Sequence, residues 1–282
     1  MGRFANVNML EREPYDVGRF AWLPGTKPYL FYLKLKPEAL RIPGTLERLV
    51  RSFTKLNIPI LQLKISAPQD SEVLRAIVIA DLANREELID KLANGLKSIP
   101  AVISVEYEPP LLRGLAIDSR SFPLRLAGDR AVIVRKDVYE GLIRGGWEKL
   151  GSGYGQLLYL IGFEIGRRMF NAHSRIVGNR ELVVEFMKRA FQLAGMGVIN
   201  LAVLDDNEKR SLVRVYDSFE CELFKGSKDV RGNLIRGKLA GWLAERWGGL
   251  SPNELIAREV KCIARGDPYC EYSIRTGRKR RT

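Results

Sequence analysis

The order of strand and helix patterns between Tyr29 and Glu108 constrains the fold of this 282-residue chain more than any other feature. Short apolar runs bounded by turn residues are typical of strands, and apolar residues spaced three and four apart are typical of helices that bury one face. In chain order the patterns predict strand, helix, strand, strand, helix and strand, over residues 29–36, 45–56, 59–66, 72–81, 85–97 and 101–108. Residues 67–71 are expected to form the hairpin loop between the two middle strands. This order predicts a four-stranded antiparallel sheet with both helices on one face.

That arrangement is the ferredoxin-like fold, and the order and size of this half of the chain resemble the ACT-type regulatory domains. The resemblance implies that the domain binds an amino acid or a similar small ligand, or that it pairs two copies of the chain into a dimer. Residues 36–44 take the place of the glycine-bearing turn that usually follows the first strand in that family. We therefore expect an N-terminal extension over residues 1–28, an ACT-like domain over residues 29–112, and a linker over residues 113–122.

The pattern of residues 123–275 predicts a second domain that mixes helices and strands. Its most apolar segment, residues 154–170, is apolar almost all round, and a helix of this kind is usually buried on every side, so we expect it to be the central helix. Around it the patterns predict helices over residues 137–150, 181–193 and 233–247, and strands over residues 131–135, 197–204, 211–218, 254–264 and 269–274. The fold class is therefore α+β, with a second, α/β domain built on an antiparallel sheet and a basic tail over residues 276–282.

The three cysteines, Cys221, Cys262 and Cys270, all lie in the second domain. Their odd number argues against a secreted disulfide framework. The turn residues 265–268 predict a β-hairpin, in which a loop of three or five residues would direct the sulfurs of Cys262 and Cys270 to one face and a loop of four would separate them. Glu259 would point away from Cys262 on a regular strand, so it can join the sulfurs only if the strand carries a bulge or a break.

Two thiolates and a carboxylate are acceptable ligands for zinc, and a structural zinc ion takes four ligands. Cys221 is the first candidate for the fourth ligand, and His173, the single histidine, is the second. The same residues are also compatible with free buried thiols, or with a disulfide between Cys262 and Cys270.

Residues 259–272 resemble the terminal signature of the 4-vinyl-reductase domain, in which a Glu, a Cys, the pair Gly-Asp and a second Cys occur in this order. Residues 158–166, 215–220 and 236–243 resemble the central helix of that domain and the strand and helix that follow it. The resemblance implies a compact fold around an apolar pocket and a relationship to a subunit of a vesicle-tethering complex. It also implies a role like that of sensor domains that detect aromatic hydrocarbons and phenols.

In such sensors one Glu and three Cys hold a zinc ion. The resemblance therefore implies that Glu259, Cys262 and Cys270 are zinc ligands, whereas Gly232 stands where the remaining cysteine is expected. Cys221 is the candidate that replaces it, from eleven residues earlier in the chain.

Two pairs of glycines spaced four apart, Gly162 with Gly166 and Gly237 with Gly241, remove the side chains from one face of two expected helices. This spacing predicts close packing of helices, or one end of a ligand cavity. The side chains that could line such a cavity, or else fill an ordinary core, are Tyr159, Phe163, Phe170, His173, Phe186, Phe191 and Trp242. In the alternative, His173 faces solvent at the end of its helix.

The sequence contains no phosphate-binding loop, nucleophile motif or paired-histidine metal site, so we expect a binding protein and not an enzyme. The leading hypothesis is a small-molecule sensor or regulatory protein that encloses a hydrophobic or aromatic ligand, forms a homodimer and signals to a protein output partner, as in transcription regulation. One alternative is a nucleic-acid-associated regulator, because the net charge is +13 and five basic residues crowd into residues 275–282. The other alternative is a structural assembly module without a ligand.

The chain has no apolar run of roughly 18 residues and no secretory signal pattern, so we expect a cytoplasmic protein with no membrane partner. The many charged residues are typical of a protein from a thermophile.

Overall fold

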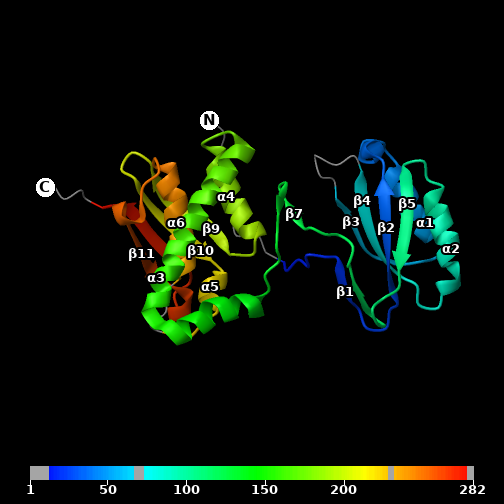
Figure 1. Cartoon of the computed structure of the whole chain (residues 1–282), viewed down its shortest axis with the longest axis horizontal. Helices are drawn as coiled ribbons and strands as arrows, with labels where there is room; N and C mark the ends of the chain where they lie inside the picture. The colour runs from blue at the N-terminus through cyan, green and yellow to red at the C-terminus, as the bar shows by residue number, and fades with distance from the viewer. Residues whose placement is uncertain (1–12, 67–72, 228–231, 278–282) are drawn as a thin grey trace. The chain divides into compact units, whose positions relative to one another are not determined.

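The computed structural model describes residues 13–66, 73–227 and 232–277, which form two compact units that divide between Val132 and Ile133 (Figure 1). The expected hairpin loop at residues 67–71 lies outside the described residues, as do residues 278–282 of the expected basic tail. None of the helices in the described ranges combines the length and the apolar character that a membrane span requires.

The first unit contains the predicted ferredoxin-like fold. Its main elements are β2 (Pro28–Leu35), α1 (Thr45–Thr54), β3 (Ile60–Ser66), β4 (Leu74–Asp81), α2 (Ile89–Lys97) and β5 (Val102–Glu108), with short 3-10 turns at Pro37–Leu40 and Glu86–Leu88. The strands form an antiparallel sheet in the order β3-β4-β2-β5. Leu49 and Phe53 of α1 and Leu92 and Leu96 of α2 share one buried cluster with Phe31 and its neighbours in the sheet, so both helices cover the same face.

The opposite face of this sheet carries a smaller apolar cluster that includes Leu30 and Ile79. Two short paired strands, β1 (Phe20–Trp22) and β6 (Leu115–Ile117), contribute Ala21 and Ala116 to it. Residues 113–122, expected to be a linker, therefore take part in the first unit. So does the end of the expected N-terminal extension.

A second small ribbon, β7 (Arg125–Leu126) with β8 (Asp129–Arg130), precedes the unit boundary. The strand expected over residues 131–135 is not formed, and that prediction was wrong. β-branched residues favour strands where their side chains can pack on a partly buried sheet surface. Val132, Ile133 and Val134 are exposed, so they have no such surface to pack against.

The second unit packs helices against a four-stranded antiparallel sheet in the order β11-β12-β10-β9. Its elements are α3 (Lys136–Val177), α4 (Leu182–Leu193), β9 (Val198–Asp205), β10 (Arg210–Tyr216), α5 (Phe219–Glu222), α6 (Asn233–Arg246), β11 (Leu255–Lys261) and β12 (Cys270–Thr276), with 3-10 turns at Pro252–Glu254 and Ile263–Arg265. All the elements predicted for residues 137–275 are present. Helix α5 is an additional element that was not predicted.

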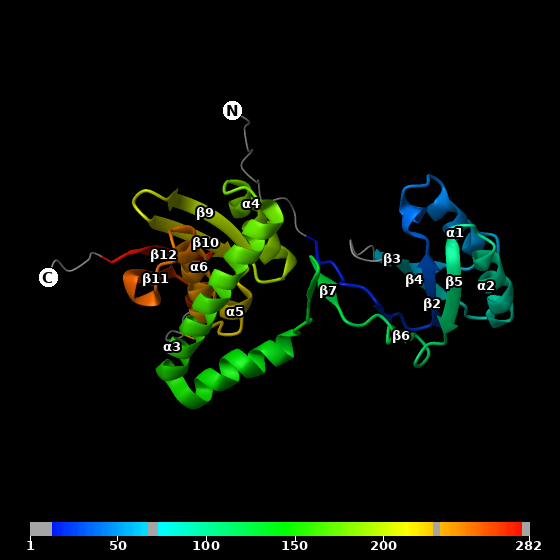
Figure 2. The same ribbon diagram turned by 45° about the horizontal axis from the view of Figure 1, so that its top comes forward.

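Helix α3 bends at Gly151, which has a left-handed φ of 59°, and Figure 2 shows the two arms meeting there. The two arms correspond to the helices predicted over residues 137–150 and 154–170. The expectation that the second arm is buried on every side was wrong, because Leu157, Leu160 and Ile161 are 49, 52 and 43% exposed. Apolar residues all round a helix are buried only where other elements cover them, and these three side chains have no such cover among the described residues.

The buried side of α3 lies against α6 through the two glycine pairs. A Cβ atom added to Gly166 would overlap the backbone carbonyl of Lys238, and one added to Gly241 would overlap the carbonyl of Phe163. The glycines therefore let the two helix backbones touch. The close helix packing predicted from their spacing is confirmed.

Candidate metal centre

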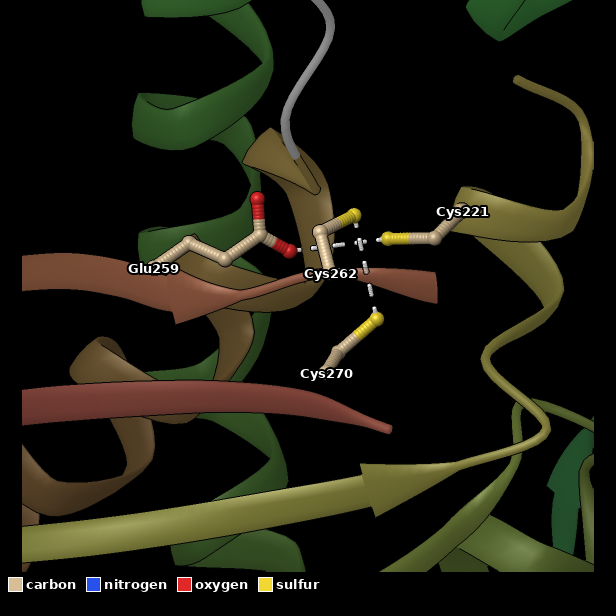
Figure 3. Close-up of side chains that lie close together, drawn as sticks. All are labelled: Cys221, Glu259, Cys262 and Cys270. Carbon is tan, nitrogen blue, oxygen red and sulfur yellow. Dashed lines mark hydrogen bonds between the residues drawn. The ribbon is translucent and has the colours of Figure 1, made fainter. Parts of the chain in front are cut away.

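Four potential metal ligands, Cys221, Glu259, Cys262 and Cys270, converge in the interior of the second unit. Their ligand atoms all lie within 4.8 Å of one another. Each of the four residues is buried, with 6% of Glu259 exposed and less of the three cysteines. Figure 3 shows the four side chains pointing toward a common centre from α5, from the end of β11 and from the start of β12.

A β-bulge brings Glu259 to the same side as Cys262. Glu259 pairs with Tyr272 and Lys261 pairs with Glu271, so Val260 is an extra residue in β11 and is 49% exposed. The bulge shifts the alternation of side chains by one position. The sequence-based condition for joining Glu259 to the cysteines is therefore met.

The connection between Cys262 and Cys270 comprises residues 263–269, which is longer than the three-, four- or five-residue loops considered from the sequence. Lys261 pairs with Glu271. Cys262 and Cys270 are the next residues toward the turn, so they lie opposite each other where the two strands end. The Asp267 carboxylate accepts a hydrogen bond of 2.7 Å from the Cys262 amide and fixes the turn. Gly266 provides its left-handed residue, with φ of 94°.

Cys221 reaches the centre from the short helix α5, whose first turn is capped by the Ser218 hydroxyl. Position 232, where the family resemblance places a cysteine, faces the same centre. A Cβ atom on Gly232 would lie 2.9 Å from the Cys221 sulfur and 3.2 Å from a Glu259 carboxylate oxygen. Cys221 therefore occupies the space into which a side chain at position 232 would point.

The separations fit a tetrahedral zinc ion. The sulfurs of Cys262 and Cys270 are 4.0 Å apart, and the Cys221 sulfur is 3.7 Å from Oε1 of Glu259. Zinc–sulfur bonds of about 2.3 Å in a tetrahedron place two sulfurs about 3.8 Å apart. The separation of the two sulfurs is far longer than the roughly 2.05 Å of a disulfide bond, and all three cysteines are free thiols.

The surroundings of the cluster supply hydrogen-bond donors to negatively charged ligands. The Gly232 amide donates to Glu259 at 3.1 Å, and the Ile263 amide donates to the Cys270 sulfur at 3.5 Å. The Tyr272 hydroxyl lies 3.8 Å from the Cys221 sulfur, and burial raises the pKa of Tyr272 well above its usual range, so the hydroxyl keeps its proton. These contacts orient the ligands and balance their charge.

Ionisation of the cluster depends on burial and on the close approach of the sulfurs. Burial raises the pKa of Glu259 to about 7. Close contact with the Cys221 and Cys262 thiols lowers the pKa of Cys270, whereas burial acts in the opposite direction. A cation at this position would favour the charged form of all four ligands.

His173, the second candidate for the fourth ligand, lies elsewhere in the unit. Its Nδ1 accepts a hydrogen bond of 3.4 Å from the Trp242 indole, and its ring centroid is 5.0 Å from that of Phe186. His173 is buried, so the alternative of a solvent-facing histidine was wrong. Burial lowers the pKa of His173, which keeps the imidazole neutral.

The other expected pocket residues lie in three different settings. Phe170 packs edge-on against Trp242, with ring centroids 5.1 Å apart, and therefore belongs with His173 and Phe186. Tyr159 instead stacks under the Arg236 guanidinium and lines a surface pocket of about 520 Å³. Phe163, Phe191 and Trp242 are members of the buried core.

Glu220 is a buried carboxylate that the sequence analysis missed. It accepts hydrogen bonds from the amides of Leu234 and Ile235, at 2.9 and 2.7 Å, and so caps the beginning of α6. Burial raises its pKa to about 7, although the two backbone hydrogen bonds act in the opposite direction. The sequence shows Glu220 only as an acidic residue between Phe219 and Cys221, and this pattern is too common to indicate a buried carboxylate.

No family model matches this chain. Among curated proteins, an uncharacterized protein of Methanocaldococcus jannaschii is 26% identical over 133 residues, which is 47% of this chain and 71% of that protein.

Three solved structures show a partial likeness to this chain. The phenol-responsive sensory domain of the transcription activator PoxR, with phenol, has a TM-score of 0.46 at 17% identity, over 54% of this chain and 79% of that chain. A vinyl-4-reductase family protein from Methanocaldococcus jannaschii has a TM-score of 0.31 at 21% identity, over 43% and 68% of the two chains. The ACT domain of the GTP pyrophosphokinase of Chlorobium tepidum has a TM-score of 0.24 at 12% identity, over 29% and 100%. With identities under 25% and TM-scores under 0.5, these likenesses assign neither a fold nor a function to this chain.

Proposed function

We propose that this chain is a zinc-stabilised regulatory protein that binds a hydroxylated aromatic molecule in its second unit and catalyses no reaction. The observation that carries the proposal is the convergence of three buried thiols and one buried carboxylate within 4.8 Å. The residues that would hold the ion are Cys221, Glu259, Cys262 and Cys270.

A zinc ion with four protein ligands has no open coordination position, so its role there is structural. The four ligands come from α5, from β11 and from the first residue of β12. The ion would therefore fix the helix α5 to the hairpin that ends the sheet. This cross-link joins segments that are distant in the sequence, as a disulfide would in an oxidising compartment.

The zinc assignment is tested by measuring the metal content of protein purified without added chelator, using elemental analysis and native mass spectrometry. We expect one zinc ion per chain, and we expect Co²⁺ in its place to give thiolate charge-transfer absorption. Cys270→Ser and Glu259→Gln should lose the metal, whereas Glu208→Gln, an exposed carboxylate in the same unit, should keep it. Metal-free protein after refolding with excess zinc would contradict the assignment.

The ligand assignment rests on the chemistry of His173. Because Nδ1 accepts the Trp242 hydrogen bond and the ring is neutral, the imidazole proton resides on Nε2. That nitrogen can donate to the oxygen of a phenol or a similar hydroxyl compound, while the rings of Phe170 and Phe186 supply an aromatic surface beside it.

The ligand assignment is tested with phenol and toluene, which differ chiefly in the hydroxyl group. We expect phenol to raise the melting temperature of the zinc-loaded protein and to shift the His173 ring signals in NMR spectra, and toluene to act more weakly. His173→Phe should weaken phenol binding about tenfold, because a hydrogen bond to a buried polar partner is worth about 1.4 kcal/mol. If neither compound shifts the His173 signals, the ligand assignment is wrong.

A homodimer is supported by the exposed apolar residues of α3. Leu157, Leu160 and Ile161 follow one another at helical spacing on the side of α3 that faces away from α6, and a second copy of the chain would bury them. We expect native mass spectrometry to show a dimer that Leu160→Glu converts to a monomer. Leu193→Glu, at an exposed position at the end of α4, should leave the dimer intact. A monomeric wild-type chain would refute this part of the proposal.

A further inference from the structure

A groove of about 750 Å³ runs along the first unit between α1 and α2, remote in sequence from the metal centre. Helix α1 presents Arg48, Arg51 and Ser52 to it, and Lys55 and Leu56 follow directly after the helix. Helix α2 presents Lys91, Leu92 and Gly95, and the turn that follows α2 closes the groove. The lining residues are Arg48, Arg51, Ser52, Lys55, Leu56, Lys91, Leu92, Gly95, Ser98, Ile99 and Pro100.

The rim of this groove is positively charged. Four cations line it, and no acidic side chain does. Arg51 forms an ion pair with Glu47 of the preceding turn. Within the described ranges of the chain, Arg48, Lys55 and Lys91 form no ion pair. Three of the four cations on the rim therefore have no ion-pair partner among the described residues, and an anion in the groove would be attracted to them.

The floor of the groove is apolar. Leu92 and Ile99 belong to the core of the first unit, and Leu56 packs against that core. A ligand that fits both rim and floor has an anionic head and an apolar or aromatic body. Inorganic ions satisfy the rim alone, and neutral hydrocarbons satisfy the floor alone.

Gly95 leaves space on the α2 side of the groove. Glycine inside a helix costs about 0.5–1 kcal/mol of stability relative to alanine. A Cβ atom on Gly95 would meet nothing within 4 Å, as is also true of Gly141 in α3. Neither packing nor a left-handed conformation requires this glycine, and the space above it is part of the groove.

We propose that the α1–α2 groove binds a small organic anion, with a phosphate or carboxylate head held by Arg48, Lys55 and Lys91 and an apolar body over Leu56 and Ile99. The first unit is thereby a second ligand-binding site, chemically distinct from the neutral site proposed near His173. An anion here and an aromatic compound there would allow the protein to respond to two signals.

The proposal is tested with the full chain by NMR titration and calorimetry at low ionic strength. The probes are phenyl phosphate and 3-phenylpropanoate, and the neutral control is benzyl alcohol. We expect at least one anion to shift the amides of α1 and α2, with an affinity that falls as salt is added. Binding of phenyl phosphate alone would identify a phosphate site, and binding of the carboxylate would extend the site to carboxylic acids.

Lys91 and Lys97 provide a matched pair, because both are exposed lysines of α2 and only Lys91 lines the groove. Lys91→Gln should weaken anion binding about threefold, as expected for one partly exposed charge, and Lys97→Gln should leave it unchanged. The triple variant Arg48→Gln, Lys55→Gln, Lys91→Gln should lose on the order of twentyfold.

Gly95 variants test the shape of the groove independently of charge. Gly95→Ala should raise the melting temperature of the first unit, and Gly95→Leu should abolish anion binding while the unit stays folded. The proposal is overturned if neither anion shifts the α1 and α2 amides, if Lys97→Gln weakens binding as much as Lys91→Gln, or if DNA shifts these amides when the small anions do not. None of these outcomes bears on zinc or on the His173 site, so the two proposals fail separately.

Discussion

At the scale of single residues, His173 is the group whose protonation is coupled most directly to the packing of the second unit. Burial lowers its pKa from the ordinary value of 6.5, so folding favours the neutral ring. The unfolded chain therefore binds more protons between the two pKa values. The stability that the neutral ring contributes is fully present above pH 6.5 and is lost as the pH falls through the lower, folded-state pKa.

We predict that His173→Gln removes this dependence. The free energy of unfolding of the wild type minus that of the variant should decrease as the pH is lowered from 7.5 to 5, measured by urea denaturation at saturating zinc. The difference isolates His173, because Glu259 and Glu220 titrate in both proteins. A difference that is constant over this range would mean that His173 has the same pKa in the folded and unfolded chains.

Glu220 shows how one buried carboxylate can organise a helix. Its two oxygens accept the amides of Leu234 and Ile235 at the beginning of α6. Glu220→Ala would leave both donors buried and unpaired, and we expect a loss of about 3 kcal/mol in the free energy of unfolding. Glu222→Ala, two residues later, removes only an exposed ion pair with Lys136, and it should cost less than about 1 kcal/mol in the same urea titration.

At the scale of elements, the seam between α3 and α6 depends on the absence of side chains. We predict that Gly166→Ala destabilises the second unit by about 3 kcal/mol or more, because its Cβ atom would overlap the Lys238 carbonyl and neither backbone can move away cheaply. Gly141→Ala is the matched control in the same helix, because a Cβ atom there meets nothing within 4 Å. It should stabilise the unit by roughly 0.5–1 kcal/mol. Equal effects of the two substitutions in thermal unfolding would exclude a role for the seam.

The elements of this protein were largely predictable from local patterns, since the periodicity of apolar residues is a local property. The failures concern what lies beside an element. The sequence pattern predicts that Leu160 is a core residue, and only the coordinates show that it is exposed among the described residues. Helix α5 is only four residues long and follows a strand directly, so its sequence carries no helical period.

The sequence was sufficient to predict which residues form the candidate site, but not how they are arranged. Turn residues and spacing pointed to Glu259, Cys262 and Cys270, but the bulge at Val260 that joins them is invisible in the sequence. The choice between Cys221 and His173 as the fourth ligand also required coordinates. Eleven residues separate Cys221 from Gly232, and only the fold brings both to one centre.

At the scale of the whole molecule, the two units should differ in their response to the loss of metal. All four candidate ligands belong to the unit that begins at Ile133, and the core of the first unit contains none of them. A ligand that binds only the folded state stabilises it by RT ln(1 + [L]/Kd), which is about 4 kcal/mol when free zinc exceeds Kd a thousandfold. Removal of zinc should cost the second unit this amount and leave the first unit unchanged.

We predict that a strong chelator raises the rate of amide hydrogen exchange in β10, β12 and α6 and leaves the rate in β2 and β4 as it was. Cys270→Ser should reproduce the effect without chelator and should make the protein insensitive to it. Exchange resolves the two units separately, whereas a single melting curve does not. Faster exchange in both units would show that the metal stabilises the chain as one cooperative body, and unchanged exchange in β12 would show that the four ligands do not depend on a metal for their arrangement.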